Sequence, residues 1–313
     1  MRCSCPIRAT VAVVLTMLCS HAAAESIRPP LPSDITLNKD AGRGSYLFVT
    51  VRLESGEKLP FIVDTGSPIT LFAKSLEPKL GKRLGTVGIW SPGIGTRKGG
   101  IFTTPKLYLG STPLVTGTHV FTSGMTLQTL FTRRRVRGIL GIDCLLHYCI
   151  QVDFAAGKMR FLNPEQLDVA QLGKAFPIKL SDRRDNVLPF IHHAGLSGGT
   201  GTNLLIDTGC HLDGFVENGA IKSHGLGRML SLFGRGRSMP KCIWGGAKYT
   251  KIHVRVTGSQ NTLGLRFLAR HLVTLDFPNR TMYLKQTSAG PLPTAPQAGK
   301  STHAIKPGSV NDT

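Results

Sequence analysis

The tripeptide Asp-Thr-Gly occurs twice in this chain, with its aspartates at Asp64 and Asp207. Each copy directly follows an apolar run, residues 61–63 and 204–206. A buried strand that ends on a carboxylate and turns at a glycine presents that carboxylate at the floor of a cleft. Two such copies can present two carboxylates to each other, and a pair that shares one proton can serve as general base and general acid.

The sequence around the two motifs is also repeated. Residues 141–161 align without a gap on residues 264–284, with Gly141 on Gly264 and Asp153 on Asp276. Two residues lead into each glycine, Ile139-Leu140 and Thr262-Leu263, and a strand–turn–strand pattern precedes each Asp-Thr-Gly. The chain is therefore a tandem duplication of one unit.

The pattern of short, β-branched segments and glycine-rich turns predicts an all-β protein. Helical signal is confined to residues 142–148 and 265–271, which occupy equivalent places in the two units. The predicted boundaries are a signal peptide at 1–24, an extended lead-in at 25–43, a first lobe at 44–163, a second lobe at 164–286 and a disordered proline-containing tail at 287–313.

With these residues the chain resembles the aspartic peptidases, in their two-lobed, single-chain, pepsin-like form of bacterial type. The individual lobes are similar to the compact retropepsin-like enzymes. The resemblance covers residues 46–284 and implies two pseudo-twofold-related, β-barrel-like lobes with short helices. It also implies that the apolar-apolar-Gly steps support the motif loops, and that Thr65 and Thr208 bond across the axis. Two departures are Cys210 after the second motif and the lack of an obvious match to the family's flap tyrosine.

This resemblance makes Asp64 and Asp207 the expected catalytic pair. Ser67 is placed to donate a hydrogen bond to ionised Asp64, whereas the thiol of Cys210 is a weaker donor, so we expect the shared proton to favour Asp207. The residues expected to support the pair are Thr65, Gly66, Ser67, Thr208 and Gly209.

A flap over the substrate is expected from residues 88–96, which have the glycine content of a mobile hairpin tip. Trp90, Gly93 and Gly95 are the expected substrate-binding residues there, with Trp90 in place of a flap tyrosine. The alternative is a surface turn with Trp90 packed against its lobe.

The net charge and the cysteines indicate which partners and which thiol chemistry to expect. The chain has 38 basic and 18 acidic residues, and loss of a signal that carries Arg2 and Arg8 takes the net charge from +20 to +18. No nucleic-acid-binding module accompanies this charge, so it indicates attraction to anionic envelope polymers or acidic substrates. Without the signal four cysteines remain, as free buried thiols or with one bridge: Cys144, Cys149, Cys210 and Cys242.

The expected function is that of an exported aspartic endopeptidase, secreted or periplasmic, acting on peptide or protein substrates as a monomer. No metal, other cofactor, nucleic-acid partner or integral membrane span is expected. Two alternatives stay open: a catalytically silent pepsin-like protein that binds peptide or carbohydrate, and a basic envelope-binding protein on the same fold.

Overall fold

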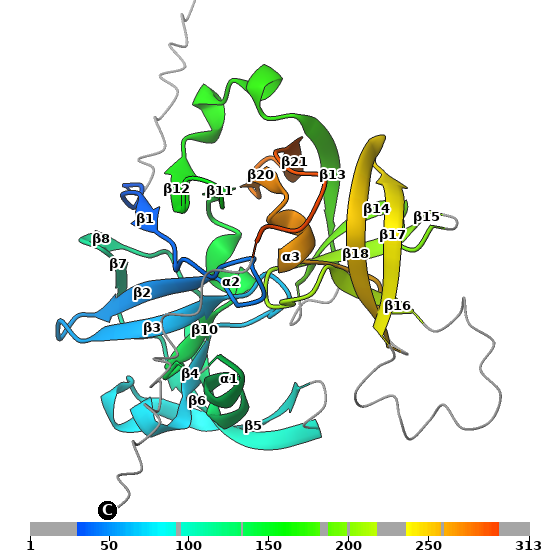
Figure 1. The fold of residues 1–313 in the computed structure, drawn as a ribbon. Helices are drawn as coiled ribbons and strands as arrows, with labels where there is room; N and C mark the ends of the chain where they lie inside the picture. Colours follow the sequence, from blue (N-terminus) through cyan, green and yellow to red (C-terminus); the bar gives the residue numbers. More distant parts are fainter. Residues whose placement is uncertain are drawn as a thin grey trace, which may run out of the picture.

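The structure is a computed structural model that describes residues 30–91, 95–132, 134–181, 187–198, 201–217, 236–257 and 260–293. This part of the chain is mostly β-strand, in two nine-stranded sheets and one three-stranded sheet with a few short helices (Figure 1). The predicted all-β class is confirmed at this level. Within the same residues, no helix is long and apolar enough to cross a membrane. The predicted signal peptide lies outside the described residues.

The first large sheet is built from the first half of the chain. Its spatial order is β5-β6-β9-β4-β10-β3-β2-β7-β8. One 3₁₀ helix, η1 (Lys74–Lys79), and two α-helices, α1 (Thr126–Thr132) and α2 (Ile142–Leu145), accompany it. Its strands are β2 (Phe48–Leu53), β3 (Lys58–Val63), β4 (Leu71–Ala73), β5 (Arg83–Ser91), β6 (Gly95–Thr103), β7 (Leu107–Leu109), β8 (Thr112–Pro113), β9 (His119–Ser123) and β10 (Gly138–Leu140).

The second large sheet runs β1-β12-β11-β20-β21-β13-β14-β15-β19, and so takes strands from both halves. The three-stranded sheet, in the order β16-β18-β17, follows the second motif. The second half of the chain also forms three short helices: η2 (Pro164–Gln166), η3 (Val169–Gln171) and α3 (Leu265–Leu268). The strands are β1 (Ile35–Thr36), β11 (Cys149–Asp153), β12 (Lys158–Leu162), β13 (Lys174–Leu180), β14 (Pro189–Ala194), β15 (Gly201–Asp207), β16 (Gly214–Glu217), β17 (Gly236–Trp244), β18 (Ala247–Thr257), β19 (Thr262–Gly264), β20 (His271–Asp276) and β21 (Thr281–Gln286).

The two strands that lead into the motifs have the same surroundings. β3 pairs antiparallel with β2 and parallel with β10, while β15 pairs antiparallel with β14 and parallel with β19. Such strands, flanked on both edges, bury apolar side chains, and Phe61 and Ile206 are fully buried. The predicted recurrence of hairpin, motif and Gly-led segment is therefore present in the sheet pairing.

One antiparallel pair, β11 with β20, joins the two halves. Gln151 lies opposite Thr274, which is its equivalent in the repeat, and their side chains form a hydrogen bond of 3.1 Å. On either side, Cys149 faces Asp276 and Asp153 faces Leu272, again in symmetric order. The halves are thus held by a continuous hydrogen-bonded ladder.

The lead-in predicted at 25–43 contributes the edge strand of this ladder. β1 pairs with β12, with Ile35 opposite Met159, as β13 pairs with β21 on the other side. Leu37 and Ala41 are buried, and the Asn38 carboxamide bonds the backbone of Phe48. The described end of the lead-in is part of the folded unit.

The tail prediction was wrong for its first residues. Thr287 and Ser288 both donate their backbone N–H to the carbonyl of Arg270, at 2.8 and 3.0 Å. Ala289 accepts from the Arg270 guanidinium at 3.0 Å. The described chain is therefore fixed to the second half beyond Gln286, because a buried arginine needs these backbone acceptors. Residues 294–313 lie outside the described residues.

We expect the position of a C-terminal truncation to decide its effect. A chain that ends after Pro293 should unfold at the same denaturant midpoint as the full chain. A chain that ends after Gln286 loses the bonds that Arg270 makes with residues 287–289 and should be destabilised by about 2–3 kcal/mol. Urea unfolding of the two truncated chains tests this, and equal midpoints would contradict it.

Two further predictions are settled by the local structure. The helices after Gly141 and Gly264 occur where predicted but span one turn each rather than two. The four cysteines of the described chain are all free thiols, as in the unbridged alternative.

Candidate active site

The two motif aspartates meet at the ends of equivalent strands. Asp64 follows the last residue of β3, and Asp207 is the last residue of β15. A Cβ atom added at Gly66 would lie 2.6 Å from the Asp207 Oδ1 atom, and one at Gly209 would overlap the Asp64 carboxylate. Only glycine lets each backbone approach the opposite carboxyl group this closely.

Thr65 and Thr208 tie the two loops together through four reciprocal hydrogen bonds. The Thr65 hydroxyl donates to the Ile206 carbonyl at 2.6 Å and accepts from the Thr208 N–H at 3.0 Å. The Thr208 hydroxyl donates to the Val63 carbonyl at 2.8 Å and accepts from the Thr65 N–H at 3.0 Å. Both side chains are buried, so the geometry of the pair is fixed by bonds that water does not compete for.

The segments that begin at Gly141 and Gly264 each donate a backbone hydrogen bond to the adjacent motif loop. The Ile142 N–H donates to the Ser67 carbonyl at 2.8 Å, and the equivalent Leu265 N–H donates to the Cys210 carbonyl at 2.7 Å. A Cβ at Gly141 or Gly264 would overlap the backbone of the loop it supports. The repeat thus preserves contacts around the site as well as sequence.

The surroundings of the two carboxyls separate their protonation. Burial raises the pKa of Asp64 to about 6, against the lowering effect of backbone N–H bonds from Gly66 and Ser67. Burial and the negative charge of Asp64 raise the pKa of Asp207 well above its usual range. The bond between the carboxyls lowers the pKa of Asp64 and raises that of Asp207. The pair therefore shares one proton, and these causes favour Asp207 as its holder.

The expected role of the Ser67 side chain was wrong. Its hydroxyl donates to the Ile69 carbonyl at 2.8 Å, so the hydrogen bonds to Asp64 come from backbone N–H groups instead. The equivalent Cys210 thiol is buried, with Leu212 and Thr262 as its hydrogen-bond partners. Both side chains stabilise their own loops. The difference in donor strength between the hydroxyl and the thiol is not needed to explain why the shared proton favours Asp207.

We expect Cys210→Ser to leave the protonation of the pair nearly unchanged. Serine keeps the size of the buried side chain and its neighbours Leu212 and Thr262, and the backbone donors to Asp207 are unaffected. The pH–rate profile should move by less than about half a unit. A shift of a full unit toward acid would show that the side chain at this position sets the proton balance.

The predicted flap is a hairpin in the structure. β5 and β6 pair antiparallel through Trp90 opposite Thr96 and Ser91 opposite Gly95, whose φ is +80°. The hairpin projects from the first half in Figure 1. Gly93 lies outside the described residues, and the placement of the Trp90 side chain is not described, so its predicted substrate contact stays a prediction.

Several residues near the pair were not singled out from the sequence. In the first half, Asp143 accepts from the Thr70 hydroxyl at 2.7 Å and from its N–H at 3.0 Å. In the second half, buried Asp213 stands at the position equivalent to Thr70 and pairs with buried Arg270 at 2.8 Å. Two arginines, Arg266 and Arg270, in the otherwise apolar stretch 263–270 were the only signal for this ion pair.

Tyr46 is the other residue that sequence reasoning missed. The register of β2 with β3 places it opposite Asp64, since Phe48 faces Ile62. Its ring contacts that of His211, from the loop after the second motif, with centroids 5.4 Å apart. Its contribution depends on this contact between distant segments, which leaves no pattern in the sequence.

Among the described residues, no group of three or more His, Cys, Asp or Glu side chains is placed to hold a metal ion. Comparison with protein-family models and with curated proteins finds no match. Inference about function therefore depends on the geometry of the site itself.

Proposed function

We propose that the chain is an aspartic endopeptidase with the pepsin-like arrangement of two lobes, each lobe supplying one catalytic aspartate. The observation that carries this is the meeting of Asp64 and Asp207 at the ends of equivalent strands, linked by the reciprocal Thr65–Thr208 bonds. Loops held in this way present two carboxyls with one proton at a fixed separation, which is what hydrolysis by a paired acid and base needs.

The reaction would use the two aspartates in opposite roles. Ionised Asp64 takes a proton from water while the water oxygen forms a bond to the peptide carbonyl carbon. At the same time Asp207 gives its proton to the carbonyl oxygen. In the second step the tetrahedral intermediate collapses: Asp64 returns its proton to the departing nitrogen, and Asp207 recovers the proton from the hydroxyl. The pair ends in its starting state, so no cofactor is required.

A silent peptide- or carbohydrate-binding protein is the second candidate. Loss of an aspartate or of a glycine turn would favour it, and this chain keeps both. Gly66 and Gly209 allow each backbone to approach the opposite carboxyl group closely. This close approach would give no advantage to a protein that only binds its ligand.

The deciding experiment is incubation of the purified chain with a mixed peptide library between pH 3 and 8, with and without a pepstatin-type transition-state mimic. Cleavage that the mimic blocks supports the proposal, and bound but uncut peptides support the silent alternative. We further propose that the protein is exported, as the predicted signal peptide indicates. We also propose that it acts as a monomer, because one chain supplies both aspartates. Sizing of the active species tests the second point.

The pH dependence should follow the pair. Because burial raises the pKa of Asp64 to about 6, its ionised form is lost as the pH falls below that value. We expect kcat/KM to decline as the pH falls below about 6 and to hold above that value for as long as Asp207 keeps its proton. An activity maximum near pH 2–3 would contradict this assignment.

A further inference from the structure

A half-exposed group of side chains adjoins the aspartates on the side of the second half. Tyr46 contacts His211 with ring planes tilted by 57°. Burial raises the pKa of Tyr46 to about 12, and the charges of Cys210, Asp64 and Asp207 add to this effect, so its hydroxyl remains a donor. Tyr46 therefore contacts His211 and lies within electrostatic range of the catalytic pair.

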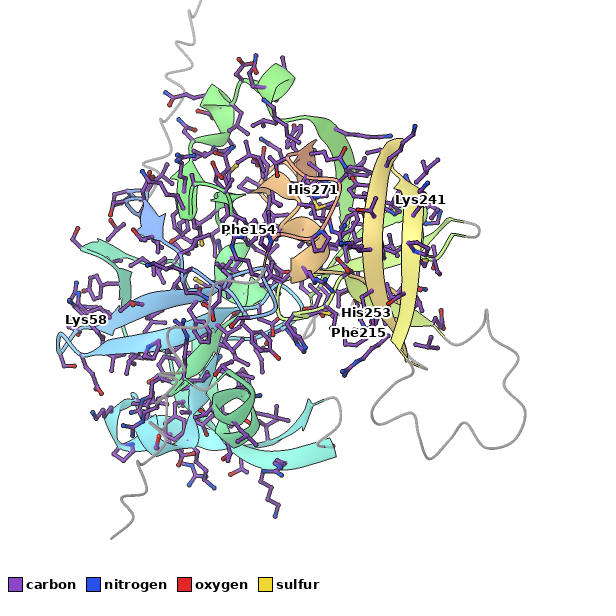
Figure 2. All side chains as sticks on the ribbon, in the orientation of Figure 1. Lys58, Phe154, Phe215, Lys241, His253 and His271 are labelled. Carbon is purple, nitrogen blue, oxygen red and sulfur yellow. The ribbon has the colours of Figure 1, made fainter. Side chains whose placement is uncertain are left out.

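Arg255 extends this group along β18. Only residues 212–214 separate His211 from Phe215, and Phe215 is the register partner of Arg255 in the parallel pairing of β16 with β18. Paired residues share a face of the sheet, and His253 lies on that face as well. Figure 2 labels Phe215 and His253 next to each other at this end of the sheet. The opposite face, with Ile252 and Val254, is buried.

The charge of Arg255 is not neutralised within the described residues, where it has no hydrogen bond or ion pair. Glu217 shares the face, but its register partner is Thr257 and its carboxylate accepts from Asn261. Burial and the nearby charge of Arg255 lower the pKa of His211. The charge of Arg255 thus disfavours protonation of His211, and Arg255 is the permanent cation of the group.

The positions that the repeat relates to Tyr46 and His211 carry different chemistry. The register of β14 with β15 places Leu188 opposite Asp207, as Tyr46 is opposite Asp64. Pro68 follows Asp64 by four residues, as His211 follows Asp207. One side of the pair is therefore polar and cationic, and the side related to it by the repeat is apolar.

We propose that Tyr46, His211 and Arg255 form a subsite for an acidic side chain of the substrate. An extended peptide laid across both aspartates meets this group on one side of the cleaved bond and Leu188 with Pro68 on the other. The preferred substrates are then peptides with a Glu or Asp on one side and an apolar residue on the other. This inference rests on the proposed function for its substrate class.

The test uses a set of octapeptides that differ by a single Glu or Gln, moved through three positions on each side of the cleaved bond. Binding to Asp207→Asn is measured by fluorescence anisotropy, and kcat/KM is measured with the unaltered chain. At positions on one side only, we expect the Glu peptide to bind about tenfold more tightly than its Gln partner, with the difference shrinking in high salt.

Arg255→Gln should remove this preference, and Arg255→Glu should transfer it to a Lys-containing peptide. Lys248→Gln is the matched control, since it removes one exposed charge from the same strand. Equal binding of Glu and Gln peptides at every position, equal losses in Arg255→Gln and Lys248→Gln, or no binding at all would overturn the subsite. Cleavage without a preference overturns the subsite alone, whereas a binding preference without cleavage overturns the proposed function alone.

Discussion

Asp64→Asn and Asp207→Asn should each lower kcat/KM for peptide cleavage by at least about 10³-fold, and the double variant should be no worse than either single variant. Asparagine keeps the size of the side chain but can neither take the proton from water nor return one. Because the two groups share one proton, removing either disables both. Measurement of kcat/KM on a cleavable peptide tests this, and near-normal turnover in one variant would remove that residue from the mechanism.

The same variants have a second readout that does not depend on activity. The pKa values of both carboxyls are raised in the folded protein, so above the unfolded value of 3.8 the folded state holds more protons than the unfolded state. Stability from this source is present in acid and is lost as the pH rises through the folded pKa values. Asp207→Asn removes the cost of keeping a buried carboxyl protonated at pH 7, where the unfolded chain would ionise it. It should therefore raise the free energy of unfolding by about 1–3 kcal/mol at pH 7, with no gain at pH 3. A variant that is destabilised at both pH values would indicate a disturbed fold rather than a disabled pair.

Arg270→Met should destabilise the protein by about 3–5 kcal/mol, because it leaves the buried Asp213 carboxylate with only the distant, partly exposed Arg266 as a cationic partner. Both side chains are fully buried, and Arg270 also donates to the carbonyls of Thr250 at 2.8 Å and Ala289 at 3.0 Å. The Asp213 carboxylate in turn accepts from the backbone N–H of His253 at 2.7 Å. One ion pair therefore fixes β18, the segment at Ala289 and the loop that follows the second motif.

Urea unfolding of a double-mutant cycle separates the pair from its surroundings. Asp213→Asn combined with Arg270→Met should recover part of the loss, since no uncompensated charge remains. Arg266→Gln is the control, because Arg266 is partly exposed and its nitrogen lies 3.7 Å from the same carboxylate. Its loss should cost under about 1 kcal/mol. A cost for Arg270→Met as small as that of Arg266→Gln would contradict the structural role of the buried pair.

The parts of the site that the sequence predicted are those written into the repeat. Alignment of Gly141 on Gly264 anticipates the parallel pairing of β10 with β3 and of β19 with β15, because equivalent apolar steps must support equivalent loops. The reciprocal threonine bonds also follow from the duplicated motif. Features that occur in both copies of the repeat could therefore be predicted from this single sequence.

The features that sequence reasoning missed depend on contacts that only one half makes. Arg270 aligns with His147, so the repeat gives no hint of a buried ion pair. Ala289 acts through a backbone carbonyl, which any residue would supply, and its segment therefore was assigned to a disordered tail. The Ser67 hydroxyl was assigned to the nearby carboxylate because sequence distance does not reveal the competing carbonyl of Ile69.

The register of β11 with β20, in which Gln151 faces its own equivalent, has a further consequence. An isologous homodimer must place each residue of its central strand in this relation, because a twofold axis exchanges the two copies. The chain thus keeps the interface geometry of a symmetric dimer of half-length subunits, now joined by the connection through η2 and η3. Covalent linkage frees the two copies from identity. Leu188 stands at the place equivalent to Tyr46, and the contact of Asp213 with Arg266 stands at the place of the bond between Thr70 and Asp143. The copies have diverged at both places, and a half-length homodimer could carry neither difference.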